Sequence, residues 1–108
     1  MKGWKVAFTR SALADIDEAY DWIAERDVDA ADRWLDALYD IIGTLQNFPE
    51  RCPVAPEGKF CNSEIREIFH GRRHHKYRIL FECDQETVIV LHVRHGARLW
   101  LGHAESDE

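Results

Sequence analysis

Residues 76–93 of the chain read KYRILFECDQETVIVLHV. Two runs in this stretch, 76–83 and 87–93, are rich in aromatic and β-branched side chains, and the polar residues Asp84-Gln85-Glu86 separate them. Runs of this length and composition are typical of strands, and a three-residue connection between two strands is typical of a hairpin. The stretch therefore predicts an antiparallel β-hairpin.

Two more segments carry the alternation of apolar and polar residues that strands show. Residues 4–8 read WKVAF, and residues 64–69, which precede the hairpin, read EIREIF. A period of two residues places every second side chain on the same face of a sheet. Residues 49–63 contain three prolines and Gly58, which predicts a loop. The sequence thus predicts about four strands.

Between residues 8 and 49 the apolar residues recur at helical spacing. One helix is expected over about residues 11–26, with Thr9 or Ser11 as its N-cap. A second helix is expected to begin after Asp29, acting as its N-cap, and to end at Asn47-Phe48-Pro49, because proline disfavours helical geometry in the residue before it. The short break between the two helices predicts an antiparallel helix hairpin.

This order of elements predicts an α+β fold. We expect an N-terminal strand and an antiparallel helix hairpin that packs on one face of an antiparallel sheet of about four strands. A chain of 108 residues has the usual size of one domain, so residues 1–108 are expected to form a single domain with an ordered core over about residues 4–101.

Composition and the pattern of apolar residues indicate where in the cell the protein is expected to act. The chain has no apolar run near the ~20 residues that a membrane helix needs, and its N-terminus lacks an apolar signal segment. Its three cysteines, Cys52, Cys61 and Cys83, are too few for a disulfide framework and predict free thiols. We therefore expect a cytoplasmic protein that makes no contact with membranes.

Charge is distributed unevenly along the chain. The formal net charge is -6, which argues against non-specific binding to nucleic acid. Acidic residues predominate from Arg10 to Glu50, whereas basic residues predominate from Ile65 to Arg98. Such an asymmetry can mark a face that binds a partner, although acidic residues also simply solvate the outer faces of helices.

Metal and cofactor sites are not expected. A zinc site would have to use Cys52, Cys61, His70 and His74, but the cysteines are too widely separated for a zinc-finger pair. The sequence contains no glycine-rich phosphate-binding loop, so it implies no nucleotide cofactor.

Several segments, taken in order, resemble the RelE/ParE superfamily of toxins from bacterial toxin–antitoxin pairs. The likeness extends over about residues 4–98, and its last part, residues 90–98 (VLHVRHGAR), is closer to the ParE branch than to the RelE branch. The other segments that carry it are Phe8-Thr9, residues 12–16, 20–26, 30–33 and 45–49, Ile65-Arg66-Glu67 and Tyr77-Arg78-Ile79.

The resemblance implies a toxin that is neutralised by an antitoxin, a small DNA-binding protein encoded by a neighbouring gene. ParE-type proteins inhibit DNA gyrase, which requires a complementary surface and no catalysis. RelE-type proteins cleave messenger RNA on the ribosome, commonly with a lysine-rich loop and a C-terminal aromatic hydroxyl. Here that loop offers only Lys59, and the aromatic residue is Trp100, which favours gyrase inhibition. An inactive relative that still binds an antitoxin is the remaining alternative.

The candidate residues for target binding or activity come from the basic half of the chain. Guanidinium groups could bind acidic side chains or phosphate, and an imidazole could act as acid or base in RNA cleavage, with Glu64 as another base. Salt bridges to Glu67, Glu82 or the acidic helices are the ordinary alternative for each arginine. A rival site is the acidic face of the helix hairpin, formed by Asp15, Asp17, Glu18 and Asp21. The candidates are Arg66, Arg78, Arg94, His95 and Arg98.

Overall fold

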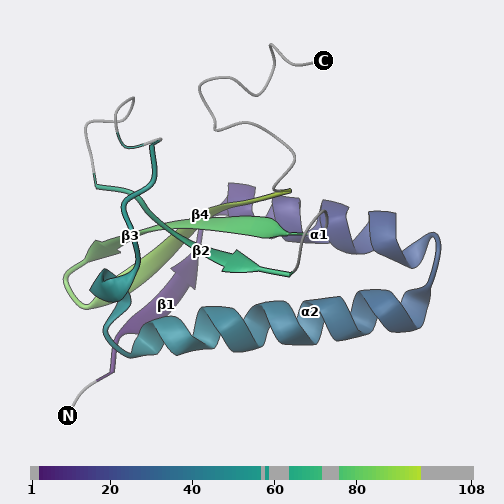
Figure 1. Ribbon diagram of the computed structural model, residues 1–108, viewed down its shortest axis with the longest axis horizontal. Helices are drawn as coiled ribbons and strands as arrows, with labels where there is room; N and C mark the ends of the chain where they lie inside the picture. The colour runs from purple at the N-terminus through teal and green to yellow at the C-terminus, as the bar shows by residue number, and fades with distance from the viewer. Residues whose placement is uncertain (1–2, 57, 59–63, 72–75, 96–108) are drawn as a thin grey trace.

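The computed structural model describes residues 3–56, 58, 64–71 and 76–95. The chain begins with strand β1 (Lys5–Phe8) and continues into two antiparallel helices that run side by side (Figure 1). The helices are α1 (Arg10–Ala24) and α2 (Val28–Gly43), and two 3-10 turns follow, η1 (Thr44–Gln46) and η2 (Pro49–Arg51). The remaining strands are β2 (Arg66–His70), β3 (Tyr77–Asp84) and β4 (Thr87–His95).

The four strands form one sheet in the order β1-β4-β3-β2. The pairs β2–β3 and β3–β4 are antiparallel, as the sequence predicts. The pair β1–β4 is parallel, so the prediction of a wholly antiparallel sheet is wrong. The chain leaves β1 through the helix hairpin and returns to pair β1 with β4, which runs in the same direction. The predicted helix hairpin on a four-stranded sheet is confirmed.

The helix starts follow local capping chemistry. Thr9 has an extended backbone, and its side chain accepts a hydrogen bond from Ala12 N at 3.0 Å, so Thr9 and not Ser11 caps α1. Asp27 caps α2 by accepting from Ala30 N at 3.1 Å. The prediction of Asp29 as this N-cap is wrong, because Asp29 already lies within the first helical turn, where its charge suits the helix dipole.

The main core lies between the two helices and one face of the sheet, which we call the helix face. Ile16 of α1 and Leu38 and Ile42 of α2 are buried in one cluster with Ile79 of β3 and Val93 of β4. Since strand side chains alternate, the neighbours of these strand residues lie on the other face of the sheet, which we call the open face.

The open face is partly covered by the segment that follows α2. Ala55, Ile65 and Leu80 are buried together there, with Leu91 packed against them. Val54 forms an antiparallel bridge with Arg66, which brings this segment to the edge of β2. Within the described residues, no helix has both the length and the apolar character needed to cross a membrane.

Candidate functional site

The structure divides the predicted site residues between the two faces of the sheet. Arg78 of β3 and Arg94 of β4 lie directly opposite each other on the open face. Arg66 is opposite Phe81, and His95 is opposite Tyr77, so both belong to the helix face. Two of the candidates therefore share one face of the sheet, and two lie on the opposite face. The fifth candidate, Arg98, is outside the described residues.

Arg78 is anchored by a carboxylate on the neighbouring strand. Its Nε and one Nη donate hydrogen bonds to Oε1 of Glu67 at 3.1 and 2.9 Å. The two side chains are only 11% and 15% exposed, so water screens their attraction weakly. The salt bridge to Glu67, which the sequence allows for each candidate arginine, is thus formed by Arg78. It fixes the position of the Arg78 guanidinium on the open face.

Arg94 differs from Arg78 in its hydrogen bonding. Its Nε is buried, and this atom has no hydrogen-bond partner among the described residues. A buried N–H group without an acceptor costs free energy, and more so when the group is charged. Arg94 as a whole is partly exposed, so its guanidinium group could form a charge-assisted hydrogen bond with an oxyanion of a binding partner.

Two further residues extend this row towards the edge of the sheet. Phe69 of β2 lies opposite Arg78 and is 41% exposed. The ammonium of Lys76 sits 5.1 Å from the centre of the Phe69 ring, which is within the range of a cation–π interaction. We call Phe69, Lys76, Arg78 and Arg94 the basic patch. It offers cations around an exposed aromatic ring, a combination that is common in protein interfaces.

Arg66 stabilises the fold on the helix face. One Nη donates to the backbone oxygen of Cys52 at 2.6 Å, and the other donates to Glu64 at 3.2 Å. The first bond ties the segment after η2 to β2. Glu64, which the sequence suggested as a base, is 65% exposed and pairs with Arg66 on the far side of the sheet from the basic patch.

His95 belongs to an aromatic row on the helix face. His70, Tyr77 and His95 lie opposite one another across three strands, and the Tyr77 and His95 ring centres are 5.1 Å apart. The Trp34 ring of α2 lies 5.1 Å from that of Tyr77. Burial lowers the pKa of His70, although a backbone hydrogen bond with Trp34 opposes this shift. This row links α2 to the end of the sheet.

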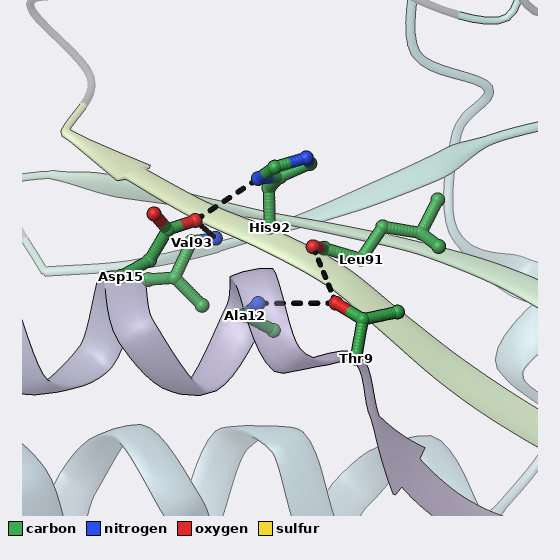
Figure 2. Close-up of polar contacts among 6 residues, drawn as sticks. All are labelled: Thr9, Ala12, Asp15, Leu91, His92 and Val93. Atoms are coloured by element: carbon green, nitrogen blue, oxygen red, sulfur yellow. Dashed lines mark hydrogen bonds and ion pairs between the residues drawn. The ribbon is translucent and has the colours of Figure 1, made fainter.

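A contact that the sequence did not predict lies beside Arg94. Oδ2 of Asp15 in α1 accepts a hydrogen bond from Val93 N at 3.0 Å and lies 3.1 Å from His92 Nδ1 (Figure 2). His92 is opposite Leu80, so it lies on the open face, on the same side as Arg94. The Asp15 and His92 side chains are 18% and 25% exposed. No local pattern links two residues so far apart in the sequence.

The described cysteines do not form a reactive centre. Burial raises the pKa of both the Cys52 and the Cys83 thiol, which disfavours the nucleophilic thiolate. Cys61 and His74, which a zinc site would need, lie outside the described residues. Within the part of the chain that the structure describes, no three His, Cys, Asp or Glu side chains gather closely enough to hold a metal ion.

Comparison with known proteins identifies relatives of the chain. Residues 6–100 match a family model described as the ParE toxin of type II toxin-antitoxin system, parDE. A solved structure described as "Chromosomal ParDE TA system from P. aeruginosa" has a similar fold, with a TM-score of 0.66 and 16% sequence identity. The similarity covers 85% of this chain and 95% of that one. No curated protein matches the chain in sequence.

Proposed function

Because the chain belongs to the ParE toxin family of type II toxin–antitoxin systems, we propose that it stops bacterial growth by binding DNA gyrase, without catalysing a reaction. The observation that carries this proposal is the partly exposed Arg94 side chain, which lies opposite Arg78 on the open face and whose Nε has no hydrogen-bond partner among the described residues. A carboxylate on the target could bind its guanidinium group.

A protein target suits the charge of the molecule better than a nucleic acid does. The net charge of -6 repels a polyanion at long range, whereas the basic patch is local and can accept one or two carboxylates. The exposed ring of Phe69 adds apolar area beside these cations. Gyrase acts in the cytoplasm, so the proposal places the toxin there.

We propose in addition that a cognate antitoxin, a small DNA-binding protein from a neighbouring gene, neutralises the toxin. Both helices expose large apolar side chains outside the basic patch. Leu13 and Trp22 of α1 are 45% and 50% exposed, and Val28 and Tyr39 of α2 are 56% and 41% exposed. A segment of the antitoxin that folds on binding could bury these side chains.

The first test is a supercoiling assay with purified gyrase, relaxed plasmid and the purified full-length protein. We expect the toxin to stop ATP-dependent supercoiling and the antitoxin to restore it. In cells, induction of the toxin alone should cause filamentation and a DNA-damage response. Normal supercoiling at toxin concentrations well above that of gyrase would contradict the proposal.

Cleavage of messenger RNA is the second candidate function, and the Asp15–His92 contact favours it. An imidazole oriented by a carboxylate can transfer protons, and guanidinium groups can stabilise the charge that develops on a phosphate during cleavage. His92, Arg78 and Arg94 share the open face. Rapid arrest of translation with cut messenger RNA, and no change in supercoiling, would support this function over gyrase inhibition. Expression without any growth defect would indicate an inactive binding module.

A further inference from the structure

The position of Arg94 depends on an irregularity in β4. The β3–β4 pairing changes register between Leu80 and Phe81, since Phe81 is opposite Val90 whereas Leu80 is opposite His92. Leu91 is therefore an extra residue, as in a β-bulge. Because side chains alternate, one extra residue reverses the face that every later residue takes.

The bulge decides which side chains enter the core. With it, Val93 lies opposite Ile79 in the main core, and Arg94 lies opposite Arg78 on the open face. With a regular β4, the same pairing would place His92 opposite Ile79 and Arg94 opposite Tyr77, on the helix face. The basic patch thus exists only in the bulged register.

Groups from the start of α1 hold the bulged segment. β1 ends at Phe8, just before this part of β4. The backbone N–H of Thr9 donates to Val90 O at 3.0 Å, and its hydroxyl donates to Leu91 O at 2.9 Å. The Asp15 carboxylate accepts a hydrogen bond from Val93 N (Figure 2). Thr9 and Asp15 therefore make the backbone hydrogen bonds to β4 that a neighbouring strand would otherwise make.

We propose that Asp15 is a positioning residue for Arg94. Its carboxylate binds Val93 N and His92 immediately before Arg94, and it thereby fixes the bulged register that brings Arg94 to the side of Arg78. Asp15 acts through the β4 backbone and not by contact with the target. The inference rests on the proposed function only in so far as Arg94 contacts that target.

The test compares five variants of the full-length protein. Asp15→Ala removes the acceptor, and Asp15→Asn keeps an oxygen that can accept from Val93 N. Asp17→Ala removes an exposed acidic residue from the same helix and is the matched control. Arg94→Ala, alone and combined with Asp15→Ala, completes the set.

The register is measured directly, without any target. Cross-strand contacts between Ile79 and Val93 in NMR spectra report the bulged register, and hydrogen exchange reports protection of the Val93 amide. We expect Asp15→Ala to lose the Ile79–Val93 contacts and Asp15→Asn and Asp17→Ala to keep them. An Asp15→Ala protein with unchanged contacts would overturn the inference. So would an unprotected Val93 amide in the unaltered protein, a result that holds even if Asp15→Ala does not fold.

Gyrase inhibition provides the functional readout. We expect Asp15→Ala and Arg94→Ala each to raise the inhibitory concentration about 10- to 100-fold, the loss of one charge-assisted contact. The inhibitory concentration of the double variant should be no higher than that of Arg94→Ala alone, since both changes remove the same contact with the target. Fully additive losses would contradict the positioning role. If the unaltered protein leaves gyrase active, the proposed function fails, and the NMR register still decides the role of Asp15.

Discussion

Arg78 and Arg94 lie directly opposite each other in the antiparallel β3–β4 pair, and Glu67 bonds to Arg78 from β2. Like charges opposite each other destabilise a sheet. Glu67 offsets this repulsion at Arg78, and the partly exposed guanidinium group of Arg94 can bind an acceptor from outside. The arrangement is thus stable in the free protein and still suited to binding an acidic partner.

Removal of the Glu67 charge should destabilise the protein. Glu67→Gln removes the carboxylate that binds the largely buried Arg78 guanidinium, and we expect the free energy of unfolding to fall by about 1–3 kcal/mol in urea denaturation. Glu64→Gln is the matched control. Glu64 is 65% exposed in its pair with Arg66, so its loss should cost about 0–1 kcal/mol. Equal effects of the two changes would contradict the role given to Glu67.

The N-cap of α2 offers a comparison of two nearby aspartates. Asp27→Ala removes the acceptor for Ala30 N and should lower the free energy of unfolding by about 1 kcal/mol. Asp29→Ala loses only a favourable charge near the helix N-terminus and should cost about 0.5 kcal/mol. Urea denaturation measures both values. A larger loss of stability for Asp29→Ala than for Asp27→Ala would indicate that Asp29 is the N-cap, as the sequence predicts.

The turn between β3 and β4 should gain stability from a change of two residues. Gln85 and Glu86 have φ angles of 49° and 68°, the left-handed region that side chains other than those of glycine and asparagine rarely adopt. Positive φ angles at both central residues match a type I′ turn, which favours the sequence Asn-Gly. Replacement of Gln85-Glu86 by Asn-Gly should raise the free energy of unfolding by about 1 kcal/mol. A lower melting temperature would show that these side chains stabilise the turn.

Acid should weaken the protein through His70. Burial lowers the pKa of His70 in the folded state, so the unfolded state binds the proton more tightly. The stability that comes from neutral His70 is present above the unfolded pKa of about 6.5 and is lost as the pH falls towards the folded pKa. Urea denaturation measures the free energy of unfolding at pH 7.5 and at pH 5.5. The difference between the two values should be smaller for His70→Phe than for the unaltered protein. An equal pH dependence would contradict this role.

Much of the fold is predictable because it follows from local patterns. The apolar stripes of α1 and α2 and the alternation in β3 indicate elements whose neighbours are close in sequence. The family match over residues 6–100 confirms the resemblance to the ParE branch. The parallel pairing of β1 with β4 is not predictable in this way, because the two strands lie at opposite ends of the chain.

The candidate site was only partly predictable. Alternation with Ile68 already places Arg66 on the helix face, and alternation with Ile79 places Arg78 on the open face, so this separation could have been found in the sequence. The side taken by Arg94 depends on the bulge at Leu91, which in turn depends on Thr9 and Asp15 from a distant part of the chain. Local patterns carry no such information.

If the basic patch inhibits gyrase through Arg94, a supercoiling assay with matched arginine variants should show it. Arg94→Ala is compared with Arg33→Ala, which removes an exposed arginine from α2. We expect the inhibitory concentration to rise about 10- to 100-fold for Arg94→Ala and to stay unchanged for Arg33→Ala. A folded Arg94→Ala protein that inhibits gyrase as well as the unaltered protein does would show that Arg94 does not contact the target.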